Sequence, residues 1–452
     1  MDHLSRSFPN HLKLKIFLAF AILSGIATLG VWLAHLQPPV LKKTIHSTQL
    51  GDIPLYQPLW GADGLTLLFA DTRQQSADSL SAKLRPTTTA VAVIDAPAFL
   101  HTLASADGQC LSETKLSTAL SELTTGVSGQ NIIIAGIADG AVIPLLHAQT
   151  ASLAAASNVS IGFSVKSPAV QCLCQPKAGT DTPILTSPWH VVWADQPDAE
   201  TGVFVRKLTQ VTTRIAAYDT PATTLLADEL RALSGDPAPQ TAAAMPVIES
   251  NTRKPSDTLT IFYSGDGGWR DLDRSVAAIM VSQQYPVVGV DVLRYFWEQK
   301  SPEQAANDLA ASMAYYRSNW GTKSFVLAGY SFGADILPSI YNRLSKTDQD
   351  SVKLLALLAL GEKADFEIHV SGWLGKNSTG QPLAPELATV PKPKILCVYG
   401  QEERTETVCS TLSANEADIL ELPGGHHFDQ NYPALTQKIL AVYARHGINP
   451  AD

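Results

Sequence analysis

The chain has 452 residues, which by the rough figure of about 150 residues per domain allows two or three domains. A hydrophobic fraction of 45% and a charged fraction of 17% are typical of a globular protein with large cores and exclude a disordered chain. The net charge of −9 provides no basic surface for a nucleic acid, so we expect no nucleic-acid partner.

The first predicted element is an apolar segment, residues 16–36, which follows a basic stretch, residues 1–15, that includes Arg6, Lys13 and Lys15. About 20 apolar residues can cross a bilayer, whereas the core of a signal peptide has about 7–15. Because no convincing Ala-x-Ala cleavage site follows, we predict an uncleaved transmembrane signal anchor, with the basic end in the cytoplasm and the remainder outside. The alternative interpretation is a buried core helix.

A polar tether is predicted over residues 37–50, and a first α/β unit over residues 51–235. Apolar runs that predict strands in this unit lie at residues 65–69, 91–95, 131–136 and 190–194. Apolar strands separated by helix-length segments are typical of a parallel sheet covered on both faces. Residues 236–257, which open with Pro-containing sequence and continue rich in Ala, Ser and Thr, predict an interdomain linker.

The same series of strands begins again after the linker, in residues 258–452, with apolar runs at residues 259–263, 287–291 and 325–329. We therefore predict an internal duplication: two tandem α/β-hydrolase-like units with mostly parallel sheets. Where the second copy has Ser331, the first has Ala138, and an alanine cannot act as a nucleophile. The first copy is therefore expected to be degenerate, with a structural or regulatory role.

The segment Gly329-Tyr330-Ser331-Phe332-Gly333 is a Gly-x-Ser-x-Gly motif between an apolar run and residues that can start a helix. This order is typical of a nucleophile elbow, which holds a serine hydroxyl out at the carboxyl edge of a parallel sheet. Glycines are needed on both sides because the strained turn brings neighbouring backbone too close for a Cβ. A five-residue motif also occurs by chance, so the interpretation depends on the rest of the chain.

Two other segments of the second copy have interpretable patterns. Residues 301–304, Ser-Pro-Glu-Gln, predict a helix start with Ser301 as the N-cap, and the helix is expected to run to about Asn319. Residues 361–393 are too long for an ordinary connection, and we interpret them as a small strand at residues 366–370 plus a flap over the site.

A serine hydroxyl needs an imidazole to accept its proton and a carboxylate to orient that imidazole. In this class of fold the chain order is nucleophile, acid, histidine. Two glutamates follow one later apolar run, and two histidines follow the next. We predict a Ser331, His426 and Glu403 triad, with His427 and Glu402 as the alternatives.

Five cysteines are present, none in the paired Cys-x-x-Cys arrangement of a metal site, and no metal or cofactor is expected. Cys397 and Cys409 bracket the loop that carries the two glutamates. We predict a disulfide between them, with one of Cys110, Cys172 and Cys174 left unpaired.

The Gly-rich loop at residues 264–269 follows the first strand of the second copy. Its glycines allow backbone N–H groups to face a substrate, so we assign the oxyanion hole to the amides of Asp266 and Phe332. A carboxylate beside an oxyanion hole repels the developing negative charge. Asp266 is therefore interpreted either as a binding group for a substrate cation such as an ammonium, or as a residue that stabilises the turn.

The segment after the next strand, residues 291–297, also lies at the predicted carboxyl edge, where ligands bind in open α/β sheets. Arg294 is expected to hold a phosphate there. Tyr295 and Trp297 are expected to form an apolar wall, and Phe296 is expected to belong to the core.

Together, the motifs at residues 263–269, 291–297, 329–335, 399–403 and 424–429 resemble the bacterial VirJ/AcvB virulence-factor family. The resemblance covers about residues 258–448, and the duplicated front half is similar to the long, AcvB-like members. It implies a periplasmic α/β-hydrolase that cleaves the aminoacyl ester of lysyl- or alanyl-phosphatidylglycerol. The implied partners are this aminoacylated phospholipid and the inner membrane; which amino acid is removed, and the oligomeric state, stay open.

Two other functions are compatible with the sequence. One is a periplasmic esterase or thioesterase that acts on a different acyl substrate. The other is a non-enzymatic binding or assembly factor of a secretion system. The Ser331→Ala change separates the enzymatic from the non-enzymatic interpretation.

Overall fold

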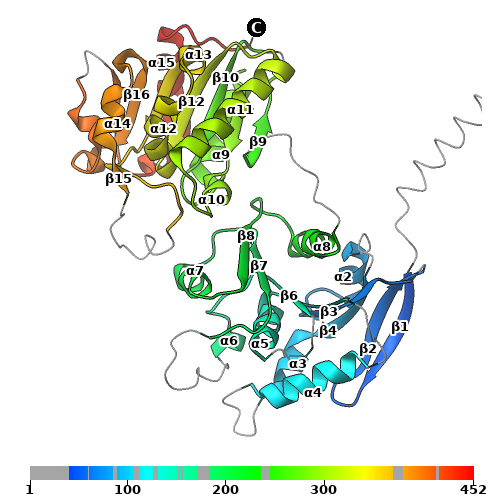
Figure 1. Ribbon diagram of the computed structural model, residues 1–452. Helices are drawn as coiled ribbons and strands as arrows, with labels where there is room; N and C mark the ends of the chain where they lie inside the picture. The colour runs from blue at the N-terminus through cyan, green and yellow to red at the C-terminus, as the bar shows by residue number, and fades with distance from the viewer. Residues whose placement is uncertain are drawn as a thin grey trace, which may run out of the picture.

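A computed structural model describes residues 40–451 except residues 60, 85–88, 105–110, 126–130, 151–152, 154–155, 172–182, 236–244, 254, 370–379 and 414–416 (Figure 1). The basic N-terminus and the predicted signal anchor at residues 16–36 lie outside the described residues. In the part of the chain that is described, no helix is long and apolar enough to span a bilayer.

The first sheet has eight strands in the order β1-β2-β4-β3-β5-β6-β7-β8. Strands β1 and β2 form an antiparallel pair, β2 is antiparallel to β4, and the remaining pairings are parallel. The strands are β1 (Val40–Ser47), β2 (Gly51–Pro58), β3 (Gly64–Ala70), β4 (Ala90–Asp95), β5 (Asn131–Ile137), β6 (Ser157–Ile161), β7 (Trp189–Trp193) and β8 (Val211–Ile215). The helices are α2 (Ala77–Leu84), α3 (Ala96–Leu103), α4 (Glu113–Leu123), α5 (Val142–Thr150), α6 (Pro168–Gln171), α7 (Ala199–Arg206) and α8 (Ala222–Leu233).

The second sheet has seven strands in the order β17-β16-β13-β12-β10-β11-β9, all parallel except β9. The strands are β9 (Val247–Ser250), β10 (Thr258–Tyr263), β11 (Val287–Val290), β12 (Ser324–Tyr330), β13 (Val352–Leu358), β16 (Ile395–Gly400) and β17 (Asp418–Leu422). The helices are α9 (Asp271–Ser282), α10 (Val292–Tyr295), α11 (Pro302–Trp320), α12 (Phe332–Arg343), α13 (Lys346–Ser351), α14 (Leu383–Thr389) and α15 (Tyr432–Arg445). A small antiparallel pair, β14 (Lys363–Ala364) and β15 (Gln381–Pro382), lies outside the large sheet.

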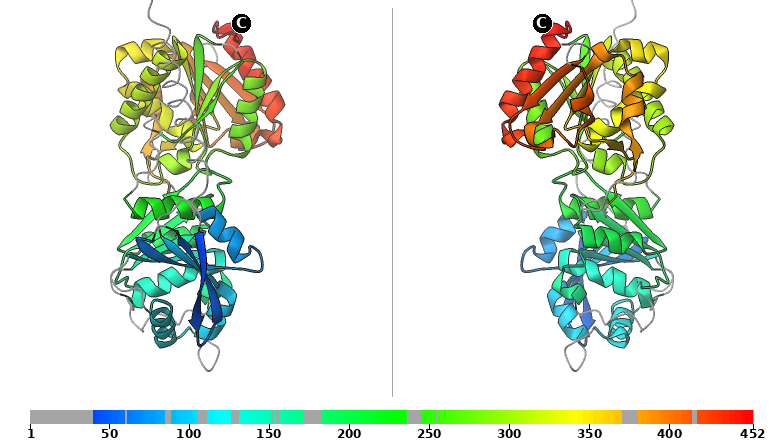
Figure 2. Two further views of the ribbon diagram at one scale, coloured as in Figure 1. Left: turned by 90° about the vertical axis from the view of Figure 1, so that its right-hand side faces the viewer. Right: turned by 90° about the vertical axis from the view of Figure 1, so that its left-hand side faces the viewer.

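The central strand β12 is almost continuously apolar because both of its faces are buried. Phe325 and Leu327 belong to one buried cluster, with residues of α11 and α12, whereas Val326 and Ala328 belong to another, with residues of α9 and α15. Alternate side chains of a strand point to opposite faces, so a strand covered on both faces needs apolar residues at every position. Figure 2 shows these helix pairs on opposite faces of the sheet, with α15 in red.

The two sheets share a strand order. From its antiparallel strand the second runs β9-β11-β10-β12-β13-β16-β17, and from β2 the first runs β2-β4-β3-β5-β6-β7-β8. They also share a turn, because Ala138 and Ser331 have φ values of 52° and 53°. A Cβ added to Gly140 or Gly333 would meet a backbone oxygen at 2.2 or 2.4 Å, respectively. The first sheet therefore keeps the elbow geometry with an alanine at the position of the serine.

Most of the predicted strands are confirmed, but three predictions near segment boundaries are wrong. The tether predicted over residues 37–50 contains β1, which pairs with β2 along its length. The linker predicted over residues 236–257 contains β9, which extends the second sheet beside β11. The strand predicted at residues 366–370 is absent over its described residues, 366–369, and the short strand β14 precedes it. Polar edge strands need few apolar residues, so the sequence has no strong strand pattern there.

Candidate active site

Ser331 lies in the sharp turn between β12 and α12, with φ 53° and ψ −120°. Its backbone N–H donates to the Leu358 carbonyl of β13 at 2.9 Å, which ties the turn to the neighbouring strand. A Cβ on Gly333 would lie 2.4 Å from the Tyr263 carbonyl oxygen, and one on Gly329 would lie 2.4 Å from the Gly333 carbonyl oxygen. Both positions therefore require glycine, because other backbone atoms lie too close for a Cβ. The strained turn is held by the neighbouring strands β13 and β10.

Three predicted residues are hydrogen-bonded in series. His426 Nε2 lies 2.9 Å from Ser331 Oγ, and His426 Nδ1 lies 2.6 Å from Glu403 Oε1. In this arrangement the carboxylate fixes the imidazole ring with its other nitrogen directed at the hydroxyl, as a base that activates a serine must be. Glu403 lies in the single turn Gln401–Glu403 after β16, and His426 lies in the loop after β17, so both lie at the carboxyl edge of the sheet, where His426 reaches Ser331.

The two alternative residues are directed elsewhere. His427 Nδ1 lies 2.9 Å from the Tyr330 hydroxyl. The backbone N–H of Glu402 donates to the Gly424 carbonyl at 3.1 Å, and a Cβ on Gly425 would lie 2.9 Å from Glu402 Oε2. Glu402 therefore packs against the loop that carries the histidines, whereas Glu403 meets the His426 ring.

The loop that carries Glu403 is closed by a disulfide between Cys397 of β16 and Cys409, whose Cα atoms are 5.8 Å apart. This pairing was predicted from the sequence and is confirmed. The other three cysteines, Cys110, Cys172 and Cys174, lie outside the described residues. Because Cys397 is fully buried in a central strand, the disulfide fixes the far end of the loop to the core.

The Gly-rich loop at residues 264–269 lies directly against the serine. A Cβ on Gly265 would lie 3.2 Å from the Tyr330 ring and 3.8 Å from Ser331 Cβ. The Ser264 hydroxyl donates to the Gly265 carbonyl at 3.1 Å and accepts from the Val292 N–H at 3.0 Å. The loop that carries the Asp266 amide is thus held beside Ser331. The Phe332 amide is at the first position of α12, where an N–H has no partner within its own helix.

One buried carboxyl group beneath this loop was not identified from the sequence. Asp273 of α9 is 3% exposed and accepts a hydrogen bond from the Gly265 backbone N–H. Burial raises the pKa of Asp273 well above its ordinary value, and the nearby carboxylates of Asp291 and Asp271 raise it further. Among the described residues, its Oδ1 has no hydrogen-bond partner. An acidic residue in the first turn of a helix usually stabilises that end of the helix, so the position of Asp273 in the sequence does not indicate that it supports the glycine loop.

Arg294, the predicted phosphate ligand, lies on the short helix α10. The Asp291 side chain caps this helix by accepting from the Arg294 N–H at 3.2 Å, and burial raises the pKa of Asp291 to about 6. The Arg294 guanidinium is itself largely buried, which lowers its pKa, while the neighbouring Asp291 carboxylate raises it. Among the described residues, Arg294 Nε is buried with no hydrogen-bond partner. This N–H is therefore unsatisfied within the described part of the chain, and no contact among the described residues brings it against the serine.

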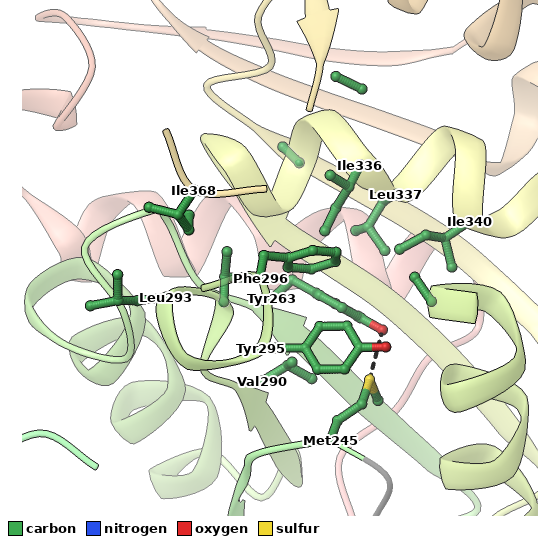
Figure 3. Packing of buried hydrophobic residues seen from close by; sticks show 14 of the residues in the cluster. Met245, Tyr263, Val290, Leu293, Tyr295, Phe296, Ile336, Leu337, Ile340 and Ile368 are labelled. Atoms are coloured by element: carbon green, nitrogen blue, oxygen red, sulfur yellow. Dashed lines mark hydrogen bonds between the residues drawn. The ribbon is translucent and has the colours of Figure 1, made fainter. Parts of the chain in front are cut away.

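The two aromatic residues predicted to form an apolar wall lie in different surroundings. Tyr295 is 6% exposed, and its hydroxyl donates to Asp308 of α11 at 2.5 Å, so its side chain points into the core beside Tyr263 (Figure 3). Tyr295 is therefore a support of the segment and does not present its hydroxyl to a ligand. Trp297 is also buried, and its indole N–H donates to Thr213 Oγ1 of β8 at 2.8 Å.

The charge near Ser331 is negative. Asp335, in the first turn of α12, accepts from the Gly361 N–H at 2.8 Å. Burial, with a smaller contribution from the carboxylates of Asp266 and Glu403, raises the pKa of Asp335 to about 8. The Asp266 and Glu403 carboxylates are thus close enough to act on Asp335, and their negative charge favours a substrate that carries a positive charge. The described residues contain no group of three or more His, Cys, Asp or Glu side chains that could hold a metal ion.

Residues 257–446 match the family model described as bacterial virulence protein (VirJ). This range includes every residue named above for the site, except Thr213, Cys110, Cys172 and Cys174. No curated protein sequence matches the chain.

Several solved structures resemble part of the chain at low identity. Est1E from Butyrivibrio proteoclasticus is 13% identical, with 44% of this chain and 92% of that chain covered and a TM-score of 0.33. The naproxen esterase from Bacillus subtilis is 16% identical, with coverages of 45% and 89% and a TM-score of 0.32. A thermophilic esterase from Thermogutta terrifontis is 14% identical, with coverages of 45% and 93% and a TM-score of 0.35.

Proposed function

Residues 257–446 belong to the VirJ family of bacterial virulence proteins, and from this premise and the geometry at Ser331 we propose that the protein is a serine hydrolase of carboxylic esters. The observation that carries the proposal is the series Ser331 Oγ, His426 Nε2, His426 Nδ1 and Glu403 Oε1, with separations of 2.9 and 2.6 Å at its two hydrogen bonds. A serine in a strained elbow with an oriented imidazole is the arrangement that activates a hydroxyl for acyl transfer.

In the proposed reaction, Ser331 Oγ attacks the ester carbonyl while His426 Nε2 takes the hydroxyl proton. Glu403 accepts from the His426 Nδ1–H and stabilises the imidazolium that forms. The backbone amides of Asp266 and Phe332 stabilise the negative charge on the carbonyl oxygen. When the tetrahedral intermediate collapses, the ester C–O bond breaks and His426 donates its proton to the departing alcohol. Water, deprotonated by His426, then cleaves the acyl-serine ester and releases the acid.

The proposed substrate is the aminoacyl ester of phosphatidylglycerol, with lysine or alanine as the acyl group. Its free ammonium matches the negative charge of Asp266 and its neighbours, which raises the pKa of Asp335. Its phosphate is assigned to Arg294, whose positive charge lies on α10 just after the carboxyl end of β11. Hydrolysis would return phosphatidylglycerol and the free amino acid, and would thereby make the membrane surface more negative.

The proposed location is the periplasm, at the inner membrane. The apolar residues 16–36 would anchor the chain or direct its export, and the Cys397–Cys409 disulfide suits an oxidising compartment. On this proposal the first sheet belongs to a degenerate hydrolase copy that has lost its nucleophile at Ala138.

The test is release of amino acid from lysyl- and alanyl-phosphatidylglycerol by the purified protein and by its Ser331→Ala variant. The proposal expects release by the wild type and at least a thousandfold slower release by the variant. Equal release by both would refute it. Hydrolysis of small aryl esters, with neither lipid cleaved, would keep the hydrolase but reject the lipid substrate.

A further inference from the structure

The carboxyl edges of the two sheets face one another. We call residues 40–235 the first unit and residues 245–451 the second unit. In Figure 1, β7 and β8 of the first unit and α10 of the second lie at the facing ends. Trp193, the last residue of β7, packs against Trp297 with ring centroids 6.0 Å apart, and the Trp297 indole N–H donates to Thr213 at 2.8 Å. The unit without a nucleophile thus contacts the edge of the sheet that holds Ser331.

Arg206, the last residue of α7, makes three contacts across this boundary. Its guanidinium lies over the Trp297 ring, 4.7 Å from the ring centroid. One terminal nitrogen donates to the Trp297 carbonyl at 2.8 Å, and the other donates to Glu367 at 3.2 Å. Because the Arg206 and Glu367 side chains are only 25% and 28% exposed, these contacts are partly shielded from water and are expected to hold the indole firmly.

A second set of contacts fixes the Gly-rich loop. Arg270, which directly follows the loop, donates to Asp195 at 2.8 Å and to Gln196 at 3.3 Å. Asp195 and Gln196 follow β7, the strand that corresponds in sheet order to β16. In the second unit, that loop carries Glu403. The loop after β7 thus corresponds to the loop that carries Glu403, but in the first unit it binds the second unit.

Trp297 is connected to the serine by a short path of aromatic contacts. The preceding residue, Phe296, lies with its ring centroid 5.5 Å from that of Phe332, which follows Ser331 in the chain. Phe296 also contacts Phe366 at 5.9 Å, and its carbonyl accepts from the Ile368 N–H at 2.8 Å. A shift of Trp297 would therefore move the segment that carries Arg294.

We infer that the first unit is a positioning cap for the Ser331 site, in which Arg206 and Thr213 hold Trp297 and thereby set the position of residues 291–297, the segment that carries Arg294. This inference rests on the proposed ester hydrolase function and gives the inactive unit a specific role in it. Arg206 is a positioning residue, since it acts through Trp297 and contacts no reacting atom.

The experiment measures kcat and KM of the full chain for lysyl-phosphatidylglycerol in mixed micelles and for p-nitrophenyl octanoate and p-nitrophenyl acetate. The Arg206→Ala variant is expected to raise KM for the two long substrates about tenfold, with kcat and the acetate reaction within about twofold of wild type. Arg206→Lys, which keeps the positive charge over the ring, should recover part of the loss. Thr213→Val removes only the hydrogen bond from Trp297 and should shift KM in the same direction by a smaller factor.

The matched control is Arg317→Ala. Arg317 of α11 has a side chain of similar exposure, 31%, and an ion pair with Asp348 at 2.9 Å. It also contacts Phe325 at 5.1 Å, near the amino end of β12 and away from the site. It should leave KM within twofold. Wild-type KM in Arg206→Ala and Thr213→Val, or an equal rise in Arg317→Ala, would overturn the inference while leaving the hydrolase intact. If Arg206→Ala does not fold, Thr213→Val decides the question. A wild-type protein inactive on all three esters would overturn the proposed function and this inference together.

Discussion

The His426 ring lies between two oxygen atoms, Ser331 Oγ at 2.9 Å and Glu403 Oε1 at 2.6 Å. The role of Glu403 can therefore be tested separately from that of the adjacent Glu402. Glu403→Gln should lower kcat for ester hydrolysis by about 10²–10⁴, because an amide cannot stabilise the imidazolium and can favour the wrong tautomer. Glu402→Gln changes an adjacent residue that does not face the ring, and it should remain within about threefold of wild type. Equal losses in both would contradict the assignment of the acid.

Asp335 provides a prediction about pH and stability. Its pKa is raised to about 8 by burial, above the ordinary value of 3.8, so between these pH values the folded protein holds a proton that the unfolded chain releases. The free energy of unfolding should therefore fall as pH rises from about 4 to 8, with this group contributing up to about 1.4 kcal/mol per pH unit.

The Asp335→Asn variant should remove this contribution while its amide oxygen still accepts from the Gly361 N–H. Urea denaturation from pH 4 to 9 would measure the difference in slope between variant and wild type. Asp350→Asn is the control, since the Asp350 side chain is 60% exposed, and it should keep the wild-type slope. A slope unchanged by Asp335→Asn would show that this carboxyl group does not titrate as described.

The triad residues could be predicted from their order along the chain. The residues whose role comes from burial in the folded protein could not. Ser331, the histidine pair and the glutamate pair follow predictable strands, so the class of site could be inferred. Asp335 and Asp273 have no distinctive spacing, because burial alone makes them unusual. Tyr295 was placed on the correct segment, but its orientation toward Asp308 depends on α11, whose packing the sequence does not specify.

Among the structural elements, the loop closed by the Cys397–Cys409 disulfide affects the site most directly, because it holds Glu403. Cys397 and Cys409 are separated by 12 residues in the sequence, a loop whose closure is expected to stabilise the fold by about 3 kcal/mol. Reduction should lower the free energy of unfolding by about that amount. It should also lower kcat, since Glu403 would be held less firmly against His426. Guanidinium denaturation and ester hydrolysis, each with and without dithiothreitol, would measure both effects.

The control for this prediction is the Cys397→Ser/Cys409→Ser double variant, which should resemble the reduced wild type and should not respond to dithiothreitol. If the oxidised and reduced proteins had the same kcat, the disulfide would stabilise the fold without ordering the acid.

Strand β6, which we did not predict from the sequence, contains buried polar residues that form hydrogen bonds inside the protein. In β6, Asn158 and Ser160 are fully buried, yet Asn158 bonds to His147 at 2.7 Å and Ser160 donates to the Ala141 carbonyl at 2.6 Å. Such a strand looks like a loop when only hydrophobic periodicity is considered, because the compensating hydrogen bonds come from distant residues. By contrast, α11 began at Pro302 after the N-cap Ser301 as predicted, since capping is a local interaction.

At the scale of the whole molecule, the two sheets keep one topology but differ in chemistry. The first unit retains a positive φ at Ala138, so a serine can be placed there without a new turn. Ala138→Ser introduced into the Ser331→Ala background should nevertheless restore no ester hydrolysis, because the loops after β7 and β8 supply no histidine. Recovery of more than about 1% of wild-type kcat would show that the first unit has an intact base.

Covalent labelling can test whether Ser331 is a nucleophile that is activated by His426. The full chain is treated with an alkyl fluorophosphonate, and the adduct is located by intact-mass and peptide mass spectrometry. We expect one adduct, on the peptide that contains Ser331. It should be lost in Ser331→Ala, and it should form at least a hundredfold more slowly in His426→Ala but not in His427→Ala. An adduct on another residue, or labelling of Ser331 at an unchanged rate in His426→Ala, would contradict this expectation.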